Sequence, residues 1–422
     1  MKKVWIALLV LCCVALCACT APHRSDAFIV GSDVVPLPEA TPQPTLQAPH
    51  TPALPSSASV TSSTYRPEVV PSAFASSENF STALYVLLTE SIRAGEGDAD
   101  ASALSVTQEQ FDGVRAFLLA RNPWGTLTDI TLDDVEPGRI VLTYSLDDPD
   151  ECAAQAQRFD DAASAALSAC VPENASQLTA ASSLYKFVSQ VISQNYVDEN
   201  FEAADDGLYS ALVDGEGVDR SFAYLYSFLL DQVGVENAVV LSETGEHAWN
   251  LLTIDGRSFY CDPQMEAGLS GGQSLRGFGL SGEDMAAFNG WETWTLENGA
   301  AQPETETLFP AVAQANFADV SPSEGALYFD AMDGRAGVFR MDLASGEVLD
   351  IVECTPKALA VLGENVYYLD SADNLLYSYN TADGAILQAV EGVPLRSMRR
   401  VGSELRYVTQ EDESTESVIS LN

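Results

Sequence analysis

Apolar and polar residues in the stretch 76–174 follow a helical period in some places and a strand period in others. Apolar residues three or four positions apart predict helices, and strict alternation predicts strands. The expected elements are a helix from Leu84, a helix whose start Thr107 and Gln110 cap, strands at 130–132 and 140–144, and a helix over 150–170. We therefore expect residues 76–174 to form a small α+β module.

The next region, residues 175–300, combines two apolar helices with a run of strands. Apolar positions from Leu184 to Ile192 predict an amphipathic helix, and a second helix begins after Asp219 and ends at Gly234. Strand patterns follow at 238–241, 248–254 and 258–261. This order predicts an α+β domain.

Residues 301–422 have the pattern of β repeats. Similar strands recur about 40 residues apart, at 326–329, 366–369 and 405–408. Further strands and acidic-glycine turns follow the first two, which is typical of the four-stranded units of propeller blades. Since about four blades are needed to close a propeller, three units leave an open arc, a small irregular β domain, or a domain that a partner completes. The fold class expected for the whole chain is α+β.

The start of the chain has the pattern of a targeting segment. Two lysines follow Met1, an apolar stretch covers residues 4–18, and the sequence Leu-Cys-Ala-Cys ends at Cys19. A stretch of this length is short for a membrane span and typical of a signal peptide. Its end resembles a bacterial lipobox, which implies that residues 1–18 are a lipoprotein signal peptide and that Cys19 is acylated. An ordinary secretory signal is the alternative.

A proline-rich segment separates this start from the folded regions. From residue 19 to residue 75, prolines alternate with Ser, Thr and Ala, and no hydrophobic period is present. Such a composition predicts a semi-extended tether. Together with the lipid anchor, it predicts a protein attached to the cell membrane and facing the extracytoplasmic side.

The chain is strongly acidic. It has 20 Lys and Arg residues against 61 Asp and Glu, a formal net charge of −41. This charge argues against nucleic-acid binding, which needs basic surface, and against docking onto anionic lipid headgroups. Because 46% of the residues are hydrophobic, the chain as a whole is not disordered. The acidity is best interpreted as a solvated surface that keeps the protein soluble.

Three short motifs in the second region carry the candidate chemistry. Residues 215–219 read G-E-G-V-D before the second apolar helix, residues 247–250 read H-A-W-N, and Asp262 precedes a proline. This set resembles the transglutaminase-like (papain-like) superfamily, whose pattern is G-x-G-V-C, an amphipathic helix, H-A-W-N and D-P. The resemblance covers about residues 180–290. It implies that His247 is the catalytic histidine and Asp262 the aspartate that orients it.

The nucleophile position of that family falls on Asp219. A catalytic thiol at a helix start is activated by the helix dipole and a neighbouring histidine, but no cysteine lies between Cys170 and Cys261. A carboxylate is a poor nucleophile toward amides. We therefore expect an inactive domain in which Asp219 caps its helix and pairs with His247.

Other roles for these residues remain open. Cys261 is expected to be a buried apolar residue, with a relocated nucleophile as the alternative. Asp219 and His247 are a possible pair of metal ligands, with Asp262 behind them, although one histidine with carboxylates is weak evidence for a metal. Trp249 and Asn250 are predicted to line a binding cleft, with core packing as the alternative for Trp249. The candidate site therefore consists of Asp219, His247, Trp249, Asn250 and Asp262.

The function expected from these patterns is that of a binding or scaffolding lipoprotein for a peptide, cell-wall or protein partner, with no cofactor, no metal and no nucleic acid. The alternative is a hydrolase or transferase of altered mechanism, in which His247 and Asp262 act with water or a metal ion. An ion pair between Asp219 and His247 in a filled cleft would favour the first function. An open pocket with converging oxygens would favour the second.

Overall fold

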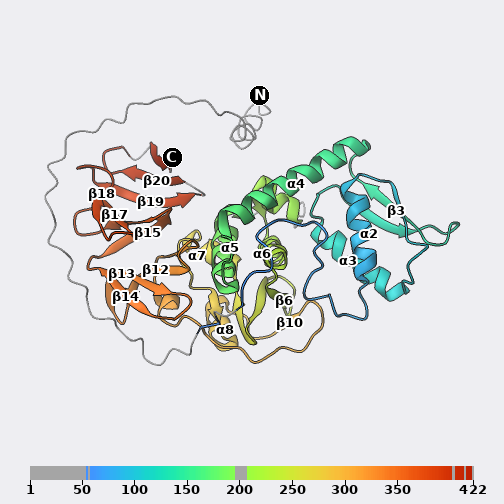
Figure 1. Ribbon diagram of the computed structural model, residues 1–422, viewed down its shortest axis with the longest axis horizontal. Helices are drawn as coiled ribbons and strands as arrows, with labels where there is room; N and C mark the ends of the chain where they lie inside the picture. The colour runs from blue at the N-terminus through green and yellow to red at the C-terminus, as the bar shows by residue number, and fades with distance from the viewer. Residues whose placement is uncertain (1–53, 56–57, 195–206, 402–403, 413–414, 421–422) are drawn as a thin grey trace. The chain divides into compact units, whose positions relative to one another are not determined.

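The computed structural model describes residues 54–55, 58–194, 207–401, 404–412 and 415–420, and every structural statement below refers to these residues (Figure 1). This part of the chain is mixed α+β, with several small antiparallel sheets and no closed barrel. The predicted signal peptide, Cys19 and most of the predicted tether lie outside the described residues. None of the described helices is both long enough and apolar enough to cross a membrane.

The first folded region packs helices against a three-stranded sheet. Its elements are α2 (Thr82–Arg93), β1 (Asp98–Asp100), α3 (Gln108–Arg121), β2 (Leu127–Leu132), β3 (Arg139–Tyr144) and α4 (Pro149–Cys170), with the strand order β1-β3-β2. Both halves of the predicted capping box are present, since Gln110 N donates to Thr107 Oγ1 and Thr107 N donates to Gln110 Oε1. The helices and strands predicted for this module are confirmed.

The second region places one buried helix against a five-stranded antiparallel sheet. Its helices are α5 (Gln177–Val191), the π-helix η2 (Ser210–Asp214), α6 (Asp219–Val233), α7 (Pro263–Ser270), α8 (Gly282–Asn289) and the 3₁₀ helix η3 (Val312–Gln314). Its strands are β4 (Ser193–Gln194), β5 (Glu216–Gly217), β6 (Glu236–Ser242), β7 (Ala248–Ile254), β8 (Arg257–Cys261), β9 (Phe278–Leu280) and β10 (Trp294–Leu296), and the large sheet has the order β10-β6-β7-β8-β9.

Helix α6 is the centre of this region. It packs against α5 on one side and against β6 and β7 on the other. Eleven of its fifteen residues are buried, as expected of a helix that is apolar on most of its circumference. Gly234 ends it in the left-handed conformation, at a φ of 76°, as the sequence predicts. This packing fixes the position of the first residue of α6, Asp219.

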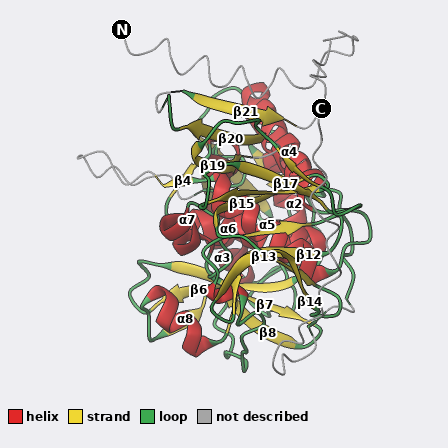
Figure 2. Cartoon of the chain, turned by 90° about the vertical axis from the view of Figure 1, so that its left-hand side faces the viewer, coloured by secondary structure: helices red, strands yellow, loops and turns green. Residues whose placement is uncertain are grey.

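The last region consists of three antiparallel sheets that lie one above another (Figures 1 and 2). The sheets are β11 (Ala318–Ser321), β12 (Ala326–Met332), β13 (Arg335–Asp342) and β14 (Val348–Val352); then β15 (Pro356–Leu362), β16 (Asn365–Asp370), β17 (Leu376–Asn380) and β18 (Ile386–Gln388); then β19 (Leu395–Val401), β20 (Glu404–Thr409) and β21 (Glu416–Ser420). The recurring strands predicted from the sequence are β12, β16 and β20. Apolar clusters fill the space between successive sheets.

A buried carboxylate joins the three sheets to the second region. Asp319 on β11 accepts a hydrogen bond from the amide of Val361 on β15 (2.8 Å) and pairs with Arg400 on β19 (3.2 Å). Its Oδ1 also lies 4.0 Å from the Nζ of Lys186 on α5. That ammonium donates to the carbonyl of Ala318 (2.7 Å). Burial lowers the pKa of Lys186 against the opposing effect of Asp319.

The described part of the proline-rich segment is not a free tether. Its hydrogen bonds to the folded core run from Val60 N to Ala175 O (3.1 Å), from Thr61 N to Val233 O (3.0 Å), from Tyr65 Oη to Asp160 (2.7 Å) and from Ser72 N to Asp231 (2.9 Å). The prediction that the tether extends to residue 75 is therefore wrong from residue 58 onward. The sequence pattern does not predict these contacts, because backbone groups and a few side chains make them. The segment has no periodic apolar face that would indicate packing.

Candidate functional site

The candidate site begins at the first turn of α6. Val218, not Asp219, is the N-cap residue, and its amide donates to the Oγ of Ser221 (3.1 Å). The predicted capping role of Asp219 is therefore wrong by one position. Its carboxylate instead bonds to the imidazole of His247, with 3.2 Å between Oδ2 and Nδ1. The predicted pair between these two residues is present, and the negative charge remains favourable beside the helix start.

His247 lies just before β7, at the end of the β6–β7 hairpin. Its backbone is fixed by Ser242, whose Oγ accepts from the His247 amide (3.1 Å) and whose own amide donates to the His247 carbonyl (3.0 Å). The second ring nitrogen, Nε2, lies 2.7 Å from Oδ2 of Asp262. Asp262 caps α7 through Met265 N (3.0 Å) and also accepts from Asn289 Nδ2 (3.1 Å). The three residues matched by the sequence motifs are thus in direct contact.

Both nitrogens of the His247 ring face carboxylates, and this decides its charge. Its side chain is 5% exposed, that of Asp262 is 0% exposed and that of Asp219 is 32% exposed. Burial lowers the pKa of His247, but the charge of Asp262 and the hydrogen bonds to both carboxylates raise it by more, to about 10. A pKa raised this far favours an imidazolium at neutral pH, whose two N–H groups each donate a hydrogen bond to a carboxylate.

Two indole rings lie near the imidazole in stacked orientations. Trp249 is stacked at 5.4 Å between ring centroids, and Trp291 at 6.4 Å with an interplanar angle of 17°. Trp249 and Asn250 are fully buried, so the prediction that they line an open cleft is wrong. Asn250 instead donates to the carbonyl of Ala223 (2.9 Å) and thereby fixes β7 to α6. Because successive residues of a strand face opposite sides of a sheet, Asn250 faces α6, whereas Trp249 packs in a separate apolar cluster with Tyr260 and Met285.

Cys261 lies next to Asp262 in the chain but belongs to the core. It is fully buried in the apolar cluster that also contains Tyr226 of α6. Burial raises the pKa of its thiol far above the usual value. A thiol that stays protonated is not a nucleophile, which agrees with its interpretation as a packing residue.

The structure does not support the alternative in which Asp219 and His247 bind a metal ion. In the part of the chain that the structure describes, no group of three or more His, Cys, Asp or Glu side chains is placed to hold a metal ion. A histidine ligand needs a free lone pair on one nitrogen, and both nitrogens of His247 bond to carboxylates. Asp205 and Asp206, which add acidic residues to this region of the sequence, lie outside the described residues.

Two residues of the site are missed by the sequence motifs. Asn289, at the end of α8, holds the carboxylate of Asp262, and Trp291 covers the ring of His247. Both lie after the last motif residue, Asp262, and they reach the site because the chain crosses from β9, at one edge of the sheet, to β10, at the other. An isolated Asn or Trp has no spacing signal that could have predicted this role.

Comparisons with known proteins leave the family open. No protein-family model matches the chain, and no curated protein matches it at a significant level.

Several solved structures align over parts of the chain, among them these three. A Dbp5 variant from S. cerevisiae bound to Nup159, Gle1, IP6 and ADP shows 10% identity and a TM-score of 0.23 over 41% of this chain and 38% of its own. The computationally designed Ika4 protein shows 12% identity and a TM-score of 0.21, over 41% and 86%. A TolB described as putative, from Agrobacterium tumefaciens, shows 10% identity and a TM-score of 0.22, over 45% and 71%. These similarities are too low to support an argument about fold or function.

Proposed function

We propose that this chain is a membrane-anchored, extracytoplasmic lipoprotein with a catalytically inactive transglutaminase-like domain, which binds or scaffolds a peptide, cell-wall or protein partner. Two features support the domain assignment. The motif residues Asp219, His247 and Asp262 are neighbours in space although they are far apart in sequence. They lie where a buried helix begins against an antiparallel sheet, which is the arrangement that the papain-like pattern implies.

The loss of catalysis is argued from the charge of His247. A papain-like reaction needs a nucleophile and a base that accepts its proton. Asp219 offers an oxygen that attacks amides poorly, and His247 is already protonated at neutral pH, since two carboxylates hold its pKa at about 10. The same protonation argues against a hydrolase in which His247 activates water. The single observation that carries this proposal is the position of the His247 ring, whose two nitrogens lie 3.2 Å and 2.7 Å from carboxylate oxygens of Asp219 and Asp262.

The C-terminal sheets support a display role. Their first strands, β11, β15 and β19, are neighbours, as in the inner ring of a propeller. We assign them as three blade-like units in an open arc. The outer face of the last sheet carries cross-strand ion pairs, Arg399 with Glu416 and Arg406 with Glu416. Charged pairs of this kind suit a solvated end face better than the apolar face that a fourth blade would need.

The experiment that tests the proposal restores the thiol in the full-length protein. The substitution Asp219→Cys places a cysteine at the start of α6, next to His247 and at a position that solvent reaches. Asp112→Cys, on an exposed residue of α3, is the matched control for the added thiol. We expect the thiol at 219 to react with iodoacetamide at pH 7 at least about tenfold faster than the thiol at 112, because His247 and the helix dipole favour a thiolate there.

Activity assays complete the test. The unmodified protein and His247→Ala should both give only background rates in amine-incorporation and amidase assays with glutamine peptides. Turnover by the unmodified protein that His247→Ala abolishes would refute the inactive domain. A thiol at 219 that reacts no faster than the one at 112 would contradict the transglutaminase-like assignment itself.

A further inference from the structure

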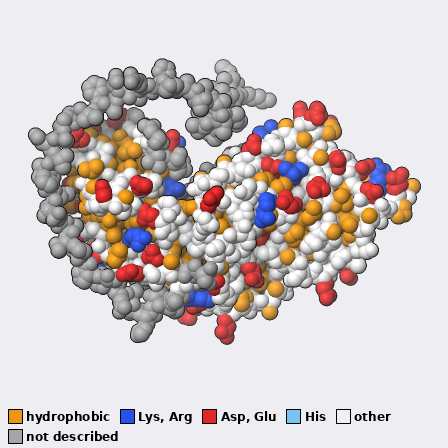
Figure 3. Space-filling view, in the orientation of Figure 1, with side chains coloured by type: hydrophobic (Ala, Val, Ile, Leu, Met, Phe, Trp, Pro, Cys, Tyr) orange, Lys and Arg blue, Asp and Glu red, His pale blue; other side chains and the backbone are white. Residues whose placement is uncertain are grey.

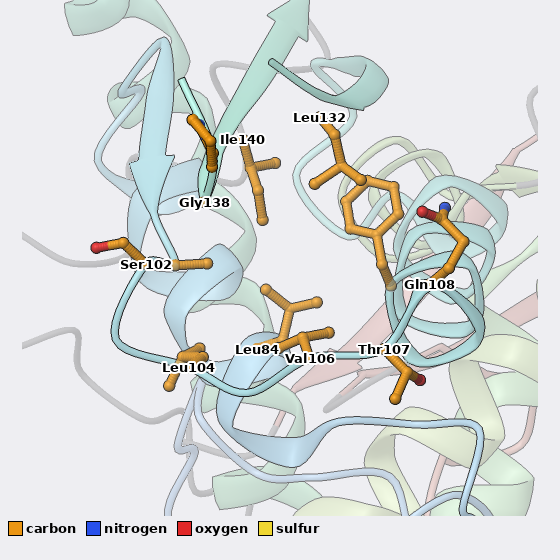
Figure 4. Close-up of a pocket in the computed structure, with 12 residues that line it drawn as sticks. Leu84, Ser102, Leu104, Val106, Thr107, Gln108, Leu132, Gly138 and Ile140 are labelled. Carbon is orange, nitrogen blue, oxygen red and sulfur yellow. The ribbon is translucent and has the colours of Figure 1, made fainter. Parts of the chain in front are cut away.

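The N-terminal α+β module contains a hollow that the candidate site does not use. Its volume is about 320 Å³, and it opens between the loop before α3, the start of α3 and the β2–β3 hairpin. In Figure 4, Leu84 and Ile140 lie toward its centre, with Ser102 and Gly138 on one side and Gln108 on the other. Leu84 and Ile140 are fully buried. The volume lies at the lower end of the range of binding pockets.

The walls of this hollow are fixed by backbone contacts. The amide of Ala101 donates to the carbonyl of Gly138 (2.7 Å), which joins the loop before α3 to the hairpin. Gly138 has a φ of +90°, and a Cβ there would lie 2.6 Å from the Cα of Ser102. The opposite wall is the start of α3, which the capping box of Thr107 holds. A hollow with such walls is present before any partner binds, which lowers the cost of binding.

Apolar surface continues from the hollow onto the hairpin. Leu132, which lines the hollow, is 42% exposed, and Val135 at the hairpin tip is 84% exposed. Figure 3 shows hydrophobic side chains between acidic ones over this module, at the right of the view. Exposed apolar side chains next to a hollow are typical of protein interaction sites. Val135 lies outside the hollow. A partner that covers both the hollow and Val135 is therefore larger than a small molecule.

The charge around the hollow selects the chemistry of the occupant. Asp100 and Glu109 adjoin lining residues, and Asp134 and Glu136 lie on the hairpin between Leu132 and Pro137; all four acidic residues are exposed. The module as a whole has 18 acidic residues and five arginines. Arg139, the basic residue of the hairpin, is paired with Asp98 and Asp133 and also lies 3.8 Å from the carboxylate of Glu136. An acidic rim attracts a basic partner and repels anionic lipid headgroups.

We propose that this hollow binds a basic segment of a partner protein, which inserts one apolar side chain between Leu132 and the loop before α3 and places lysine or arginine residues against the acidic rim. The apolar contact provides burial, and the rim provides charge complementarity. This binding site is separate from His247 and does not depend on the function proposed above.

The test measures peptide binding to the full-length protein by fluorescence anisotropy. The probe is a labelled peptide Gly-Lys-Phe-Lys-Gly, compared with Gly-Glu-Phe-Glu-Gly and Gly-Lys-Ser-Lys-Gly. The variants are Leu132→Glu and Val135→Glu, whose exposed positions tolerate a charge without unfolding. Val418→Glu is the matched control, since Val418 is a hydrophobic residue of similar exposure, 47%, in the last sheet.

The expected result is saturable binding of the lysine-phenylalanine peptide alone. Leu132→Glu and Val135→Glu each keep the acidic rim but should weaken this binding about tenfold, while Val418→Glu leaves it unchanged. Added salt should weaken it further. The proposal is refuted if the peptide fails to saturate up to about 1 mM, if the glutamate peptide binds equally well, or if Val418→Glu has the same effect. Binding of anionic vesicles that Leu132→Glu abolishes would identify a lipid contact instead and would also overturn it.

Discussion

The charge of His247 provides the most direct test of the site. Its pKa is raised from the ordinary 6.5 to about 10, because Asp262 and Asp219 outweigh the burial of the ring. At about 1.4 kcal/mol per pKa unit, this shift corresponds to a stabilisation of the folded protein by roughly 5 kcal/mol. Since the folded-state pKa is the higher one, this contribution is complete below about pH 6.5 and is lost as the pH rises through about 10.

The assay is an NMR titration of the ring in protein labelled at histidine, with the His247 signals assigned by their loss in His247→Gln. We expect the ring to remain protonated at pH 8 and to lose its proton only near pH 10. Asp219→Asn removes one of the two charges and should lower the pKa of His247, while Asp112→Asn on α3 should leave it unchanged. A ring that titrates near pH 6.5 in the unmodified protein would refute the argument, because the site would then contain a free base at neutral pH.

Three further predictions concern stability, measured by urea unfolding. Lys186→Met leaves the buried Asp319 without one of its cations and should lower the free energy of unfolding by about 3 kcal/mol. Lys357→Met, at a half-buried lysine, is the control and should lower it by no more than about 1 kcal/mol. Equal losses for the two variants would contradict a special role for Lys186. Thr107→Ala removes the cap of α3 and should cost about 1 kcal/mol, and no loss would argue against the capping box. Burial raises the pKa of Asp231 to about 6, so the stability of the unmodified protein relative to Asp231→Asn should increase as the pH falls from about 6 to 4. A difference independent of pH would contradict the raised pKa.

Local rules predict much of this fold because they act over a few residues. Thr107 and Gln110 are three positions apart, which is enough to specify a helix start. The apolar residues after Asp219 specify a buried helix, and Gly234 specifies its end. The strands at 248–254 and 258–261 follow from their apolar runs. In each case the information lies within one helix or one strand.

The parts that the sequence does not predict depend on distant contacts. The segment from residue 58 packs on the core through acceptors such as the carbonyl of Ala175, far along the chain. Trp291 and Asn289 reach His247 and Asp262 because the chain crosses from β9 to β10, at opposite edges of the sheet, and no short motif encodes this path. The motifs do predict that Asp219, His247 and Asp262 are neighbours in the folded chain.

The junction at Asp319 has a mechanical consequence. One carboxylate is shared by α5 and by the inner strands of all three repeat sheets, so the sheet stack has no independent hinge at this point. Because α5 packs directly against α6, a pull on the stack is transmitted to the helix that begins at Asp219.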